Sequence, residues 1–181
     1  MSEETTPSVV KSALPIGLLF GIIMILEFIV SYVMNIDPIT TPEIGTIMNT
    51  ANYFLLPVLF ISIACNGYKK SNFGFISFGE CLKGGVIVCL IAALVYSLFS
   101  VVFNMIFPEF IDEILVKTRA VLIAKSPEMT SDQINMALDY TKKFMNPAIL
   151  IPITILMYAF LGLIYSLIVG AIIKKDKLQS L

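Results

Sequence analysis

Four long apolar stretches determine what this chain can fold into. They cover residues 13–34, 47–66, 85–107 and 148–173, and Glu27 is the only charged residue in any of them. A helix rises about 1.5 Å per residue and the hydrocarbon core of a bilayer is about 30 Å thick, so about 20 apolar residues cross it. Lipid offers no partner to backbone polar groups, so each span must be a helix. We therefore predict an all-α fold, a four-helix transmembrane bundle that forms a single membrane domain over residues 1–181.

Composition argues against most soluble and catalytic classes. The chain is 57% hydrophobic and only 14% charged, whereas soluble domains carry about 25% charged residues. It has no His, which removes the commonest general base and metal ligand, and its three Cys form no CxxC pair. Paired carboxylates within the spans and nucleophile–base arrangements are also missing. We expect no cofactor, no metal, no nucleic acid and no catalytic residue, and we expect the lipid bilayer as a partner.

The distribution of basic residues predicts the orientation in the membrane. The first apolar stretch is too long for a cleaved signal peptide and no A-x-A site follows it, so we expect it to remain as an anchor. The connection after the second span and the tail after the fourth together hold six Lys, whereas the first connection holds none. Because basic residues are enriched on the cytoplasmic side, we predict that both termini are cytoplasmic.

The connections contain signals of helix starts and ends. Ser77 and Glu80 match a capping box, which predicts a helix that begins near Phe78 and runs into the third span. Asn66-Gly67 is typical of a helix end, so we expect the second span to stop there.

The third connection, about residues 108–147, is too long for a structureless loop. We predict two amphipathic helices, one over about residues 109–125 and one that opens with a capping box of Thr130 and Gln133. They would form a helical hairpin outside the membrane, laid on lipid headgroups or on the rim of the bundle. The hairpin is either a spacer or a cap over a ligand or partner. Two ion pairs at i, i+4 spacing are expected along it: Glu113–Lys117 and Asp139–Lys143.

Small residues recur every four positions in three of the spans. Such rows let transmembrane helices approach closely. They indicate packing within the chain or, as the less favoured alternative, a homodimer or another membrane protein as partner. The residues expected at helix contacts are Gly17, Gly21, Gly85, Ala93, Gly162 and Gly170.

Glu27 is the candidate functional residue, because a carboxylate inside a span costs about 2.5–3.5 kcal/mol near the centre of the bilayer. It either holds helices together through a bond to Tyr53 or Tyr158, or it forms a proton or cation site. Pro57 and Pro152 are expected to free backbone carbonyls nearby. Polar residues of the other spans lie at a similar depth, and we predict that they form an intramembrane cluster with it: Glu27, Asn52, Tyr53, Ser100, Asn104, Thr154 and Tyr158.

Several short motifs resemble those of a known family. They are Thr5–Ser8, Gly74–Glu80, Tyr96–Phe99, Phe107–Phe110 and Thr141–Met145. Together they resemble a family of small membrane proteins from Bacteroidota known as domain of unknown function 4199. The resemblance extends over nearly the whole chain and implies a multi-pass protein of the inner membrane. It brings no activity and no functional residue, and Glu27 matches none of its motifs.

Two classes of function remain open. In the first, the chain is a non-enzymatic accessory or interaction protein of the cell envelope. In the second, it is a small dimeric proton-linked transporter that uses Glu27, by analogy with small multidrug transporters, which also have four helices and one acid in the first. The long hairpin and the absence of Trp depart from that analogy.

Overall fold

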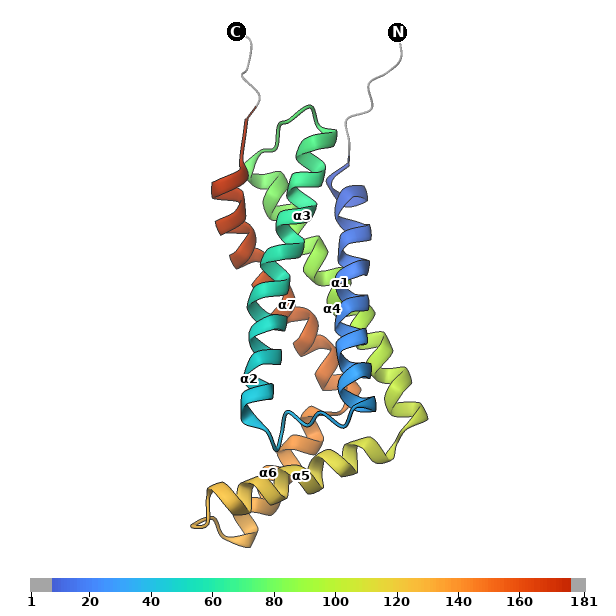
Figure 1. The fold of residues 1–181 in the computed structure, drawn as a ribbon, viewed down its shortest axis with the longest axis vertical. Coiled ribbons are helices and arrows are strands. Elements are labelled where there is room, and N and C mark those ends of the chain that lie inside the picture. The colour runs from blue at the N-terminus through green and yellow to red at the C-terminus, as the bar shows by residue number, and fades with distance from the viewer. Residues whose placement is uncertain (1–7, 177–181) are drawn as a thin grey trace.

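The structure, a computed structural model, describes residues 8–176 as a long helical bundle with a helical hairpin across one end (Figure 1). The parts of the sequence argument that involve Thr5–Pro7 and Lys177 lie outside the described residues. The elements are α1 (Val9–Val33), α2 (Pro42–Thr50), η1 (Ala51–Leu55), α3 (Leu56–Ser71), α4 (Phe78–Ile106), α5 (Glu109–Lys125), α6 (Ser131–Phe144) and α7 (Pro147–Ile173).

The all-α prediction is confirmed for the described residues. Four helical segments are long and apolar enough to cross a membrane: α1, the continuous run Pro42–Ser71, α4 and α7. All four begin before their apolar stretches, and the second also ends later, because a helix continues into the interface where water satisfies its end groups. The only β-type pairing in the described part is a single bridge between Ile76 and Lys175.

Helix α4 is the centre of the bundle, with α1 and α7 as its main neighbours. On the α1 side, a Cβ added to Gly17 would lie 2.8 Å from the Val88 carbonyl oxygen, and one added to Gly21 would lie 2.8 Å from the Cβ of Val95. The absence of side chains at these two positions therefore lets α1 lie directly against α4.

The contact between α4 and α7 is built in the same way. A Cβ on Gly162 would meet the Gly85 carbonyl oxygen at 3.1 Å, and one on Gly85 would overlap the buried Ser166 hydroxyl. Gly170 faces the Phe78 ring, and Ala93 is fully buried on α4. All six residues expected at helix contacts therefore lie inside the chain's own bundle.

The helix start predicted at Phe78 is confirmed. The Ser77 hydroxyl accepts from the Glu80 N–H at 3.3 Å, and the Glu80 carboxylate accepts from the Ser77 N–H at 2.7 Å. From this cap α4 runs without interruption to Ile106.

The helix end expected at Asn66-Gly67 is wrong, because α3 continues to Ser71. The extra turn places Tyr68 in the core, with its hydroxyl donating to Glu80 at 2.5 Å. It also lets Lys69 donate to the Ile173 carbonyl at the end of α7, at 2.7 Å. These tertiary contacts outweigh the local preference for stopping at Gly67.

The predicted hairpin is present as α5 and α6, and the capping box of Thr130 and Gln133 is formed. The two expected ion pairs are not. Lys117 instead bonds Asp37 in the α1–α2 connection at 3.3 Å, the only ion pair among the described residues. The Lys143 ammonium lies over the Tyr140 ring. Lys117 thus pairs with the half-buried Asp37, where the charges are screened less than in an exposed pair, and Lys143 lies on the face of an aromatic ring.

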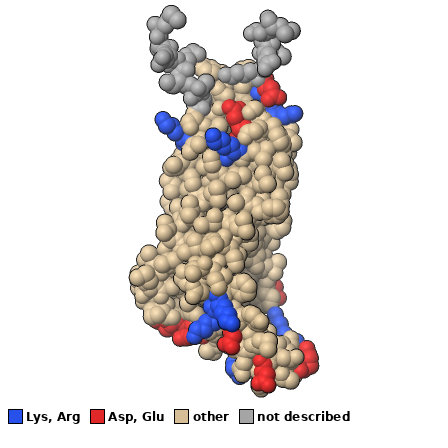
Figure 2. All heavy atoms as spheres, turned by 180° about the vertical axis from the view of Figure 1, so that it is seen from behind, with Lys and Arg blue, Asp and Glu red and all other residues tan. Residues whose placement is uncertain are grey.

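Charged side chains lie at the two ends of the molecule, and the long surface between them carries almost none on the face shown (Figure 2). Large apolar side chains point outward from this belt; Leu98 is 66% exposed, Leu156 72% and Phe160 61%. A water-facing surface of this kind would be strongly unfavourable, whereas hydrocarbon covers it without cost. The surface is therefore that of a membrane protein.

Candidate functional site

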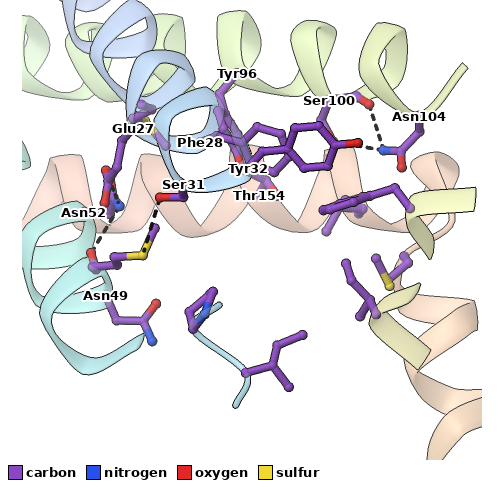
Figure 3. A pocket seen from close by; sticks show the side chains of 18 of the residues that line it. Glu27, Phe28, Ser31, Tyr32, Asn49, Asn52, Tyr96, Ser100, Asn104 and Thr154 are labelled. Carbon is purple, nitrogen blue, oxygen red and sulfur yellow. Dashed lines mark hydrogen bonds between the residues drawn. The ribbon is translucent and has the colours of Figure 1, made fainter. Parts of the chain in front are cut away.

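A cavity of about 650 Å³ lies in the half of the bundle nearer the hairpin, between α1, the α2–η1 segment, α4 and α7 (Figure 3). The structure places all seven residues of the predicted polar cluster on its wall. They come from four spans that are distant in sequence, and only the bundle brings them together.

Glu27 reaches this wall from α1, and its side chain is half-buried. The Asn52 side-chain amide donates to the Glu27 carboxylate at 2.8 Å and to the Met48 carbonyl at 3.1 Å (Figure 3). The Asn52 carbonyl oxygen Oδ1 is buried and has no hydrogen-bond partner. The expected bond from Glu27 to Tyr53 or Tyr158 is replaced by this contact with a neutral amide.

Two tyrosine hydroxyls of α7 form hydrogen bonds with backbone carbonyls of the second span. Pro57 has no N–H, so it cannot donate to the carbonyl of Tyr53 four residues earlier. The Tyr165 hydroxyl donates to that carbonyl at 2.8 Å, and the Tyr158 hydroxyl lies 3.5 Å from the Asn52 carbonyl. Here the segment Ala51–Leu55 is a π-helix, so the chain widens at the depth of Glu27. The carbonyl expected to be freed by Pro57 is therefore present and has a partner.

Ser100 and Asn104 lie on another part of the same wall, on α4. The Asn104 amide donates to the Ser100 carbonyl at 2.7 Å, so these two residues bond each other and not Glu27. The Asn104 oxygen Oδ1 is buried without a partner, as in Asn52. Thr154 of α7 completes the predicted cluster on the cavity wall (Figure 3). Two residues of the cavity wall, on two different helical segments, thus each have a buried side-chain oxygen without a donor.

Tyr96 is a member of this site that the sequence analysis did not identify. It lies on α4 one helical turn before Ser100, which is the spacing of residues on one face. Like Tyr53 and Tyr158, Tyr96 lines the same cavity as Glu27. Its periodicity with Ser100 and Asn104 is the signal that could have found it.

Aromatic rings hold one wall of the cavity in place. Phe28 of α1 packs on Phe103 of α4 with ring centroids 4.8 Å apart, and Phe103 packs on Phe110 of α5 at 5.2 Å. Tyr32 joins the same group, 5.1 Å from Phe103. Through these rings the hairpin is fixed to α1 and α4, so its first helix forms part of the rim.

An ion pair joins the rim at a second point. Asp37 bonds Lys117 of α5 and also accepts from the Ile39 N–H at 2.9 Å. Burial alone would raise the pKa of Asp37, but hydrogen bonds from Ile39 and Thr40 and the charge of Lys117 outweigh it, so this pKa lies below its ordinary value of 3.8. The carboxylate is therefore ionised and paired at neutral pH.

A second hollow of about 820 Å³ lies at the other end of the bundle, beside Tyr68 and Glu80. The Glu80 carboxylate already caps α4 and accepts a hydrogen bond from the Tyr68 hydroxyl. Within the described part of the chain no three His, Cys, Asp or Glu side chains are grouped so as to hold a metal ion. The three Cys are free and buried, and the Cys65 and Cys81 sulfurs are in contact. None of these features offers an uncommitted polar site like that of the first cavity.

The fold and the cavity define a class: a helical membrane protein with four candidate spans and a polar cavity beside an intramembrane carboxylate. The chain belongs to the family described as protein of unknown function (DUF4199), whose family model matches residues 15–175. The family resemblance noted from the sequence motifs is confirmed to that extent. Comparisons with curated proteins and with solved structures give no match.

Proposed function

We propose that this protein is a non-enzymatic, multi-pass protein of the inner membrane, a single domain whose termini are cytoplasmic and whose cavity binds a small organic ligand beside Glu27. In this role it is an accessory or interaction protein of the cell envelope. The observation that carries the proposal is the cavity itself. Its volume of about 650 Å³ lies within the range of small-molecule sites, and polar side chains from all four spans stand among apolar ones on its wall.

The packing of the bundle supports binding more than passage. On the side of the cavity away from the hairpin, buried aromatic rings pack in the middle of the bundle. Phe20 lies against Phe60 with centroids 5.0 Å apart, and both are buried. Glycine contacts also bring α1 and α7 directly against α4, which favours a cavity without a path through the bundle.

Transport is the second candidate, favoured by the contact between the cavity and the one acid inside the spans. A proton-linked carrier needs an acid that a substrate can reach, and Glu27 meets that requirement. A dimer formed through the small-residue rows is not supported, since those rows already pack α1 and α7 on α4. In liposomes, a pH-driven flux that survives both Glu27→Gln and Glu27→Leu would exclude this candidate.

Ligand binding is tested with a pair of tryptophan substitutions on α7. Thr154→Trp fills the cavity, whereas Leu156→Trp places the same ring on the outer surface, where Leu156 is 72% exposed. A set of cationic, neutral and anionic small molecules is screened for raising the melting temperature of the purified protein. A ligand at 100 times its Kd stabilises by about 2.7 kcal/mol. We expect stabilising compounds that act on the native protein and on Leu156→Trp but not on Thr154→Trp. If no compound separates the two variants, the proposal is wrong.

A further inference from the structure

The charges that line the cavity point to the sign of its ligand. Its acidic residues are Glu27, Asp37 and Glu113, and its only basic residue is Lys117, which gives a formal charge of −3 + 1 = −2. Lys117 is already bonded to Asp37. An anion would therefore find no free positive partner in the cavity, whereas Glu27 has only the neutral Asn52 as its hydrogen-bond partner. A positive ligand would supply the counter-ion that the protein does not provide.

Aromatic rings around Glu27 fit an organic cation. Tyr53, Tyr96 and Tyr158 line the cavity from η1, α4 and α7, so that together with Glu27 each span contributes one residue. Tyr53 and Tyr158 lie side by side, with ring centroids 6.1 Å apart. Aromatic faces attract cations, and desolvated cages of this type recognise organic ammonium groups.

Size and hydrogen bonding distinguish this ligand from a metal ion. A cavity of about 650 Å³ is far larger than a metal ion needs, and no metal-binding group of His, Cys, Asp or Glu is present in the described residues. Oδ1 of Asn52 and Oδ1 of Asn104 both lack a donor. Both oxygens have almost no accessible surface, so the half-buried Glu27 carboxylate is the acceptor that an ammonium group can reach.

We infer that the cavity binds a protonated organic amine, with its ammonium group between the Glu27 carboxylate and the rings of Tyr53, Tyr96 and Tyr158, and with its apolar part along the aromatic wall at Phe28. This inference rests on the proposed ligand-binding function and names the class of ligand. Figure 3 shows Glu27, Asn52, Tyr96 and Phe28 among the side chains that line this one cavity.

The test compares three compounds on one carbon skeleton: 3-phenylpropylamine, 3-phenylpropan-1-ol and 3-phenylpropanoate. Binding to the purified full chain is measured by titration calorimetry and by melting temperature. We expect the amine to bind at least about tenfold more tightly than the alcohol and the propanoate to bind weakest. Glu27→Gln should weaken amine binding at least about tenfold, since that is the effect of losing about 1.4 kcal/mol. Glu109→Gln, a change at an exposed carboxylate outside the cavity, should leave it unchanged.

The rings are tested separately at Tyr96. Tyr96→Phe keeps the aromatic face and should bind the amine as the native protein does, whereas Tyr96→Leu should weaken binding about two- to thirtyfold. These variants and the three compounds on the native protein decide the matter even if Glu27→Gln fails to fold. If the alcohol or the propanoate binds in the Thr154→Trp-sensitive manner as tightly as the amine, the inference is wrong while the ligand-binding function stands. If no compound distinguishes Thr154→Trp from Leu156→Trp, the function itself fails.

Discussion

Single glycines decide how closely α1 can approach the centre of the bundle. Gly17 leaves room for the Val88 carbonyl oxygen of α4, which no rotamer change can move away. Gly67 of α3 is a useful contrast, because it is also helical but is exposed and has no heavy atom within 4 Å of an added Cβ. The same residue type is therefore required at one position and only tolerated at the other.

This contrast gives a prediction for matched substitutions. Gly17→Ala should lower stability by about 1–3 kcal/mol, because the added methyl group forces α1 from α4. Gly67→Ala should raise it by up to about 1 kcal/mol, since alanine is the better helix former. Thermal unfolding in detergent micelles measures both. Equal effects of the two substitutions would contradict the assignment of Gly17 to a helix contact.

The ion pair between Asp37 and Lys117 predicts a dependence on pH. Because the pKa of Asp37 is lowered in the folded protein, its stabilisation is complete above its ordinary value of 3.8 and is lost as pH falls through the lower, folded value. The Lys117 side chain is 44% exposed, so the pair contributes only about 0.2–1 kcal/mol. Asp37→Asn should therefore lower the melting temperature slightly at neutral pH, and this effect should fade as the pH falls below 3.8.

The control for this experiment is Asp139→Asn, which removes an exposed carboxylate of α6. It should leave the melting temperature nearly unchanged across the same pH series. A loss in Asp37→Asn that persists at the lowest pH would show that the side chain acts through shape or hydrogen bonding and not through its charge.

At the scale of elements, the second span departs most from a regular helix. Its π-helical segment and Pro57 coincide with the depth of Glu27, and two tyrosines of α7 stand against the carbonyls there. Helix α2, which continues this span towards the hairpin, has no buried residue and packs mainly on η1. The span is thus firmly packed on one side of the π-helical segment and loosely on the other.

A double-mutant cycle tests the link between Pro57 and Tyr165. Tyr165→Phe should cost about 1–3 kcal/mol, because the Tyr53 carbonyl then lacks a donor in the core. In a Pro57→Ala background the new N–H at position 57 can donate to that carbonyl, so the cost should be smaller by at least about 0.5 kcal/mol. Equal costs in both backgrounds would show that the two residues act independently. Tyr140→Phe on the exposed face of α6 is the control.

Much of this element structure could be predicted from local signals. The caps at Ser77 and Thr130 and the four apolar stretches need only neighbouring residues to be recognised. The end of α3 could not, because Tyr68 and Lys69 extend the helix through contacts with Glu80 and with the end of α7. The ion pair of Lys117 was missed for the same reason, since its partner lies 80 positions earlier, in the connection between the first two spans.

At the scale of the whole molecule, the sequence indicated the depth of the polar residues but not their partners. Rise per residue places Glu27, Asn52 and Tyr158 at one level. Which of them bond depends on how each helix is rotated, and that is set by contacts between helices distant in sequence, such as the glycine contacts of α1 and α7 with α4. Hence the cluster was foreseeable, whereas the Glu27–Asn52 bond and the role of Tyr96 were not.

The proposed orientation can be tested by cysteine labelling in intact cells. The native thiols are unsuitable reporters, because Cys65, Cys81 and Cys89 are at most 2% exposed. Ser131→Cys on the hairpin and Ser71→Cys at the opposite end place exposed thiols instead. A membrane-impermeant maleimide added outside should label Ser131→Cys and reach Ser71→Cys only after permeabilisation. The reverse pattern would invert the proposed topology.

The irregular turn at residues 51–55 also bears on how the molecule can move. Glycine contacts and stacked rings join α1, α4, α7 and α3 into one rigid block, and α2 stands outside it. We therefore expect a change in the size of the cavity to move α2 about the π-helical segment, while the other helices keep their positions. Asn52 lies within that π-helical segment and donates a hydrogen bond to Glu27. An occupant of the cavity that competes for this carboxylate would therefore free α2 to move.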